Sequence, residues 1–150
     1  MEIILGGFLW APSKQYWHDI IDFISKDYEI IRIKKYKFAS MKDLERVIIK
    51  LYEDDNIPLD KIKKVKVKAL DQYAPVCLNF YFKIKNPITE DYHGRMIVPE
   101  VIKMKQQIRK KYKKHINNYK KDIIIHISDN PQQTDSVDNL IDSYIRKKQK

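Results

Sequence analysis

The sequence predicts a single α/β domain with a mainly parallel, or mixed, sheet and helices on both of its faces. Short apolar segments typical of buried strands alternate along the chain with segments that have helical spacing. Several of the strand segments are apolar almost throughout, as expected of parallel strands covered on both sides. The 150 residues, 33% charged and 43% apolar, suit one globular core. We expect the domain to span residues 1–146 and residues 147–150 to form a basic tail.

The first half of the chain predicts two strand–helix units. Residues 2–10 are apolar and short enough for a buried strand, and Ser13 is placed to cap the helix that follows. Residues 28–38 return to a strand pattern. Ser40 and Asp43 have the spacing of a capping box and open a second helix, which ends at residues 54–56.

The second half predicts further strands and helices. The expected elements are a strand at 64–68 with a lysine face, a strand at 76–84, a loop at 88–99 around Gly94, a helix from Pro99 through Tyr112 that ends before Asn117, a strand at 122–127, and a helix from Pro131 to about Arg146.

Cysteine use and hydropathy indicate the compartment. Cys77, the one cysteine, lies in an apolar run, which predicts a buried core thiol with no metal-ligand neighbour. Because no intramolecular disulfide can form, the sequence favours a reducing, intracellular (cytoplasmic) compartment. No apolar run approaches the roughly 20 residues of a membrane span, and the first residues lack the basic region of a signal peptide. We therefore expect no membrane partner.

The net charge of +10 suggests a nucleic-acid partner, but composition offers another explanation. Only five of the 30 basic residues are arginine. Lysine, isoleucine, asparagine and tyrosine are abundant, and all four have A/T-rich codons. Because bidentate recognition of phosphates and bases favours arginine, the charge alone does not establish nucleic-acid binding.

The segment 121–131 carries the most specific functional signal. An apolar strand runs directly into a helix start, with His126, Ser128, Asp129 and Asn130 at the junction. In open parallel sheets, ligands bind at the carboxyl ends of strands. His126 is either a hydrogen-bonded core residue or an acid/base or phosphate ligand. Ser128, Asp129 or Asn130 would cap the helix, with ligand binding as an added role.

The same helix carries acidic side chains that suggest a metal ion. Asp129 and Asp135 are candidate ligands of Mg²⁺, which would bridge the acidic helix and a phosphate. The alternative is an ordinary solvated acidic face.

The first strand–helix junction offers a second phosphate site. Ser13 and Lys14 would lie at a helix start beside a strand end, although Pro12 stands where a phosphate-binding loop requires glycine. Plain capping is the alternative. Arg95, beside Gly94 in the predicted loop, is a further candidate for contacting the substrate.

A basic helix is the third feature. Residues 101–121 contain no acidic residue but nine basic ones, around an apolar stripe that includes Met104 and Ile108. The face is either solvated or binds a polyanion. Arg109 is a candidate substrate clamp, and the candidate polyanion-binding residues are Lys103, Lys105, Lys110, Lys113 and Lys114.

Together these features predict a small enzyme acting on a phosphorylated or nucleotide-like substrate. The reaction would be phosphoryl transfer, nucleotidyl transfer or phosphate-ester hydrolysis. His126 would act as acid/base and Asp129 as base or Mg²⁺ ligand. Ser13, Lys14, Arg95, Arg109, Ser128 and Asn130 would bind the substrate. The alternatives are a non-enzymatic nucleic-acid-binding domain that uses the basic helix, or an interaction module of a larger assembly.

Overall fold

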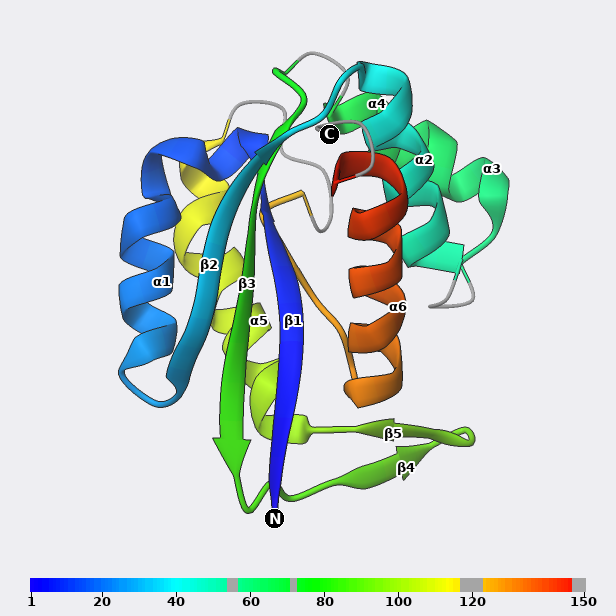
Figure 1. Ribbon diagram of the computed structural model, residues 1–150. Coiled ribbons are helices and arrows are strands. Elements are labelled where there is room, and N and C mark those ends of the chain that lie inside the picture. The colour runs from blue at the N-terminus through cyan, green and yellow to red at the C-terminus, as the bar shows by residue number, and fades with distance from the viewer. Residues whose placement is uncertain (54–56, 71–72, 117–122, 147–150) are drawn as a thin grey trace.

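The computed structural model describes residues 1–53, 57–70, 73–116 and 123–146 (Figure 1). A four-stranded sheet forms the centre, with the strand order β2-β3-β1-β6. Its members are β1 (Glu2–Trp10), β2 (Glu29–Lys37), β3 (Val76–Lys85) and β6 (Ile125–Ile127). Every neighbouring pair in this sheet is antiparallel.

The predicted parallel sheet is therefore wrong, although the predicted strand–helix–strand connections exist. One connection joins β1 to β2 through α1 (Trp17–Ser25), and the other joins β3 to β6 through α5 (Pro99–Tyr112). The two strands within each connection run parallel, but they are not neighbours. β3 lies between β1 and β2, and β1 lies between β3 and β6. This interleaving of two split β–α–β units makes all neighbours antiparallel.

Helices cover both faces of the sheet, as predicted (Figure 1). α1 and α5 lie on one face, and α2 (Met41–Glu53) and α6 (Pro131–Ile141) lie on the other. The shorter helical segments are η1 (Ala11–Tyr16), α3 (Leu59–Lys61), η2 (Ile62–Val67), α4 (Lys68–Leu70), η3 (Lys113–His115) and η4 (Asp142–Arg146). None of the helices within the described ranges is both long and apolar enough to cross a membrane.

Side chains of β1 point alternately to the two faces of the sheet and pack in the core on both sides. Gly6 faces α6, because a Cβ there would lie 3.4 Å from Thr134 Cγ2. Phe8 and Trp10 share that face and stack with ring centroids 5.2 Å apart. Leu5 and Leu9 point to the α1 and α5 face, and both are fully buried. A strand buried on both faces explains the continuous apolar run in the sequence.

Several predicted elements are confirmed. The predicted strands at 2–10, 28–38 and 76–84 agree with β1, β2 and β3 to within a residue, and the helices beginning at Pro99 and Pro131 are present. Ser40 caps α2, because its Oγ accepts a hydrogen bond from Asp43 N at 3.2 Å. Cys77 is fully buried, and this burial raises the pKa of its thiol. Asn117, Asp122 and the tail at 147–150 lie outside the described residues.

The strand predicted at 64–68 is helical instead. Alternating valine and lysine fit a strand, but the segment runs through η2 into α4. Ile62, Ala69 and Leu70 are buried and recur at helical spacing, so packing of this apolar face outweighs the local alternation.

The loop predicted at 88–99 contains a β-hairpin of β4 (Glu90–Tyr92) and β5 (Arg95–Ile97). The two residues between the strands, His93 and Gly94, have φ of 51° and 82°. Positive φ at both turn positions is the geometry that closes two-residue hairpins. The hairpin lies beneath the start of α6 (Figure 1).

Candidate functional site

The turn from β6 into α6 is fixed by two reciprocal hydrogen bonds. Asn130 is the N-cap of α6, and its Oδ1 accepts from Gln133 N at 3.0 Å. Gln133 Oε1 accepts in return from Asp129 N at 2.8 Å. Pro131 occupies the first helical position, where its missing N–H costs nothing. The predicted capping role therefore belongs to Asn130. The glutamine three residues after it was the sequence signal for its partner.

Ser128 fastens the end of β6 to β1. Its Oγ donates to Gly6 O at 3.0 Å and lies 2.5 Å from Thr134 Oγ1, and Gly6 N donates to Thr134 Oγ1 at 3.1 Å. Ser128 and Thr134 are both buried. Ser128 therefore holds the strand, the helix and β1 together, and its hydroxyl does not line the groove described below.

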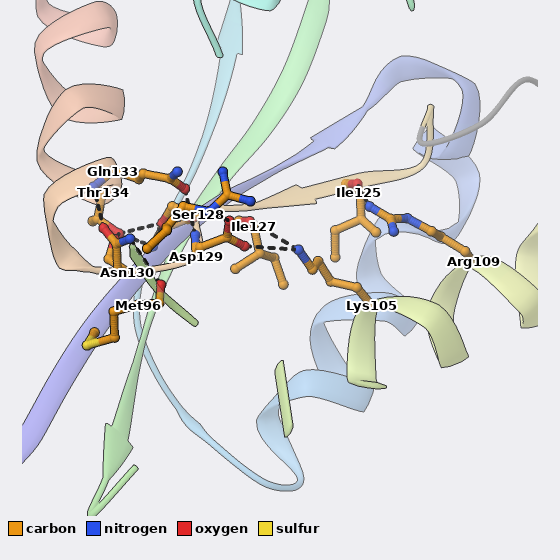
Figure 2. Close-up of polar contacts among 12 residues, drawn as sticks. Met96, Lys105, Arg109, Ile125, Ile127, Ser128, Asp129, Asn130, Gln133 and Thr134 are labelled. Atoms are coloured by element: carbon orange, nitrogen blue, oxygen red, sulfur yellow. Dashed lines mark hydrogen bonds and ion pairs between the residues drawn. The ribbon is translucent and has the colours of Figure 1, made fainter. Parts of the chain in front are cut away.

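Asp129 joins three elements through charge. Its Oδ2 lies 3.2 Å from Arg95 Nε on β5. Its Oδ1 lies 3.8 Å from Lys105 Nζ on α5, a contact drawn in Figure 2. The Asp129 and Lys105 side chains are each only 13% exposed. Low exposure strengthens both attractions relative to a surface ion pair. Two cations surround one carboxylate, which leaves an excess positive charge beside the start of α6.

The metal site predicted from Asp129 and Asp135 is not assembled here. Asp129 is ion-paired with two cations, and Asp135 is exposed on α6. Among the described residues, no group of three or more His, Cys, Asp or Glu side chains is placed to hold a metal ion. This donor set does not fit a resident Mg²⁺.

A groove of about 680 Å³ opens between the β4–β5 hairpin and the first turns of α6. Its walls include Arg95 and Met96 from the hairpin and Asn130, Gln132 and Gln133 from the helix start. Asn130 Nδ2 donates to Met96 O at 3.1 Å and so ties the two walls together. The positive end of the α6 dipole and the Arg95 side chain favour an anion, whereas Asp91 places one negative charge on the same walls. Pro131 has no N–H and Gln133 N is already bonded to Asn130, so the helix start offers an anion few N–H donors. Arg95 is therefore the charged group on these walls suited to bind a phosphate or carboxylate.

His126 lies in the middle of β6, opposite Phe8 of β1. Its side chain is on the α2 and α6 face and is only 6% exposed. Its ring meets the Tyr52 ring edge-on, with centroids 5.3 Å apart and planes at 73°. The other three histidines, His18, His93 and His115, are exposed. His126 does not line the groove, although Asn130 in the groove wall is only four residues further along the chain.

The edge of β6 is covered by side chains of α5 (Figure 2). The hydrogen bonds from Trp10 N to Ile124 O and from Ser128 N to Gly6 O set the register with β1. The alternation of antiparallel pairing then directs the N–H and C=O groups of Ile125 and Ile127 outward. Arg109 Nη2 donates to Ile125 O at 3.2 Å, and Lys105 Nζ donates to Ile127 O at 3.4 Å.

The remaining predicted substrate residues lie away from the groove. Ser13 is buried within η1, where its Oγ donates to Trp10 O at 3.0 Å, so the prediction that it caps a helix is wrong. Lys14 is exposed and lies beside Lys35. Because β1 and β6 are antiparallel, the end of β1 and the end of β6 lie at opposite ends of the pair, about four residues or 13 Å apart. Lys14 and Asp129 therefore belong to different sites.

A contact between Tyr81 and Asp138 was not predicted from the sequence. The Tyr81 hydroxyl donates to Asp138 Oδ1, which joins β3 to α6. Burial, and then this carboxylate, raise the pKa of Tyr81 above its ordinary value. Gly6 makes room for the tyrosine ring, since a Cβ at this position would lie 2.7 Å from Tyr81 Cε1.

No protein-family model and no curated protein matches this chain. Solved structures do resemble it. The nucleoside diphosphate kinase of Aquifex aeolicus is 15% identical with a TM-score of 0.56, over 94% of this chain and 95% of that chain. The NDP kinase of Pyrobaculum aerophilum is 12% identical with a TM-score of 0.54, over 93% and 95%. A nucleoside diphosphate kinase family protein of Babesia bovis is 12% identical with a TM-score of 0.53, over 95% and 91%.

The chain shares the fold of these kinases. At such low identity the likeness establishes the fold alone, and it agrees with the antiparallel sheet described above. The match covers nearly the whole of both chains, so it is not confined to one common substructure.

Proposed function

We propose that this protein binds a nucleoside phosphate and transfers its phosphoryl group. The observation that carries the proposal is the fold shared with nucleoside diphosphate kinases along almost the full length of both chains. Folds host many functions, so the site must support the proposal separately. The groove beside α6 and the buried His126 supply that support.

Arg95 supports a phosphorylated ligand in the groove. Arg95 and Asp91 are the charged residues on its walls, and Lys105 shares the Asp129 carboxylate with Arg95 outside the groove lining. Asp129 has a positioning role in this proposal, because it holds Arg95 against the end of β6. The first turn of α6 adds the positive end of its dipole. A phosphate group that enters the groove meets Arg95 on one wall and the helix start on the other.

His126 is the proposed reacting group. Its imidazole either relays a proton between acceptor and donor or carries the phosphoryl group on nitrogen between them. In either route the bond from the donor's terminal phosphorus to its bridging oxygen breaks, and the acceptor's phosphate oxygen receives the group. His126 is buried and does not line the groove, and the Tyr52 ring packs against it, so this role requires a rearrangement that opens a path from the groove to the imidazole.

Mg²⁺ enters this proposal only as part of the substrate. The donor set near α6 does not fit a resident ion, as the pairing of Asp129 indicates. Nucleoside triphosphates commonly carry Mg²⁺ on their own phosphates. No step is assigned to a protein-bound metal.

The test supplies labelled ATP and an unlabelled nucleoside diphosphate. We expect label in the new triphosphate, and we expect His126→Gln to lower the rate at least 100-fold while preserving the fold. The exposed His115 provides the matched control, and His115→Gln should leave the rate unchanged. Acid-labile label on the protein would assign the carrier role to His126, and its absence would assign the proton relay.

Two outcomes contradict the proposal. One is full activity in a folded His126→Gln variant, and the other is failure of the wild-type protein to bind any nucleotide. Release of inorganic phosphate without an acceptor would replace transfer by phosphate-ester hydrolysis.

Binding is tested separately by Arg95→Gln, which should weaken nucleotide affinity about tenfold, as expected when one charged contact to a phosphate is lost. Lys103→Gln removes a cation outside the groove and should have no effect.

A further inference from the structure

The two ends of the basic helix have different surroundings. Lys103, near the start of α5, borders a depression that Asp27 and Glu100 also line. Lys105 and Arg109 are directed to the edge of β6. The surroundings at the C-terminal end of the helix differ from those of Lys103 and from those of Lys105 and Arg109. Lys110, Lys113 and Lys114 are exposed there, at a spacing that places them on one side.

Two lysines from other elements join this end. The Tyr16 ring of η1 packs against Tyr112, with centroids 5.0 Å apart, and against His115, with centroids 5.5 Å apart. These contacts bring Lys14, two residues earlier in η1, to the same end of the molecule. Lys14 lies close to Lys35 on β2, and this close approach of a second ammonium group lowers the pKa of Lys35. Both side chains are exposed.

We call this set the cationic surface. Its members are Lys14, Lys35, Lys110, Lys113 and Lys114. None of the ion pairs found in the described parts of the chain involves any of them. Lys83, in contrast, is paired with both Glu2 and Glu29. Codon bias is one explanation for the number of lysines in the chain. It does not explain why five of them gather where no acidic side chain of the described residues pairs with them.

We propose that the cationic surface binds nucleic acid through its phosphate backbone. Lysines act as point charges on phosphates and need no particular base sequence, so binding should be non-selective and sensitive to salt. His115 is exposed beside these lysines and supplies a ring on which an unpaired base can stack.

Other polyanions fit this surface less well. Insertion into a membrane and the buried centre of a protein–protein interface both use exposed apolar side chains. The large exposed apolar residues of the described chain are Met1, Ile4, Ile31, Ile33, Leu59, Ile88 and Tyr92, none of which belongs to the set. Ile33 borders it, two residues before Lys35. The apolar side of α5, which includes Met104 and Ile108, is buried in the core and offers no anchor.

The cationic surface is separate from the groove beside α6. Lys14 lies just beyond the end of β1 where Trp10 bonds to Ile124, and Asp129 lies just beyond the end of β6 where Ser128 bonds to Gly6. The Trp10–Ile124 and Gly6–Ser128 pairs are four residues apart, which is about 13 Å along the strands. Nucleic acid should therefore bind without displacing a nucleotide, and the two proposals can fail independently.

The test measures fluorescence anisotropy of a labelled single-stranded oligonucleotide with the full chain. Lys110→Glu combined with Lys114→Glu should weaken binding at least tenfold at about 50 mM salt. The matched control is Lys26→Glu with Lys103→Glu. It makes the same change in net charge, from +10 by four units, at exposed lysines outside the cationic surface. This control should weaken binding less than threefold. Circular dichroism checks that both variants fold.

Salt dependence provides a second measure. For a single strand the slope of log affinity against log salt is about −0.7 per phosphate neutralised, so five lysines predict about −3.5. The double variant should show about −2. Equal losses in the variant and its control would overturn the proposal, because net charge alone would then explain binding. Equally tight binding to anionic lipid vesicles, lost in the same variant, would also overturn it.

Discussion

Arg109 donates a hydrogen bond to the main-chain oxygen of Ile125 at 3.2 Å and so covers one outward carbonyl of the edge strand β6. Lys105, one helical turn earlier, covers the next outward carbonyl, that of Ile127. Four residues of the helix advance about 6 Å along its axis, and two residues of the strand advance about 6.6 Å, so the two side chains meet successive outward carbonyls. This match gives part of the basic helix a structural role, because an open strand edge is a template for pairing with another chain.

Removal of the Arg109 contact should destabilise the protein and expose the edge of β6. Arg109→Ala should cost about 1 kcal/mol, the value of one partly exposed hydrogen bond to a charged donor. The neighbouring Lys110→Ala should change stability by no more than about 0.5 kcal/mol. Urea unfolding measures both, and light scattering should detect self-association only in the Arg109 variant. Equal stability of the two variants would contradict the edge role.

Asp129 should act through Arg95 and Lys105 and not through a metal ion. Asp129→Asn keeps the shape of the side chain but removes the charge that attracts both cations. We expect the variant to retain the dependence of nucleotide binding on Mg²⁺, measured by calorimetry over a series of Mg²⁺ concentrations, while its thermal stability falls. A selective loss of the Mg²⁺ dependence would instead restore the metal site predicted from the sequence. Asp135→Asn is the companion variant, since Asp135 is exposed and outside the groove.

The cap of α6 should be worth about 1 kcal/mol. Asn130→Ala removes the acceptor for Gln133 N and the donor to Met96 O. Asn130→Asp keeps the acceptor and loses the donor, so it should recover the stability of the cap without the tie to the hairpin. Chemical denaturation reports the cap, and hydrogen exchange of the hairpin amides reports the tie. We expect wild type to be the most stable, Asn130→Asp to be intermediate and Asn130→Ala to be the least stable. An Asn130→Ala variant as stable as wild type would refute the role of the cap.

Stability should decline in alkaline solution. Burial raises the pKa of Cys77 above its ordinary 9.0, and burial with Asp138 raises the pKa of Tyr81 above its ordinary 10.0. The folded state then holds these protons more tightly than the unfolded state does. The resulting stabilisation is complete below pH 9 and is lost as the pH rises from there toward the raised values.

Unfolding midpoints in urea at a series of pH values measure this loss. Cys77→Ala should remove the part that begins near pH 9 and leave the part that begins near pH 10. Tyrosinate absorbance of the folded protein should show that Tyr81 remains protonated where exposed tyrosines have ionised. A midpoint that is constant across this range would contradict the assignment.

Local patterns in the sequence determined most of the strands and helices, with the helical segment at residues 62–70 as the main exception. The apolar run at residues 2–10, the capping box at Ser40 and the Asn-Pro step at Asn130 depend on neighbours within a few residues, and all three are realised. The core position of Cys77 follows from its apolar surroundings in the same way. The hairpin around Gly94 was predicted as a loop, because its polar strands were too short to stand out from one.

Only the tertiary structure decided which residues meet. Apolar alternation is the same in parallel and antiparallel strands, so no local pattern reveals which strand lies beside β1. Once β3 and β6 flank β1 in antiparallel register, Lys14 is carried to one end and Asp129 to the other. The partners of Asp129, Arg95 and Lys105, come from a hairpin and a helix more than 20 residues earlier in the chain. Long-range pairing selected them, because only the assembled fold brings these distant residues together.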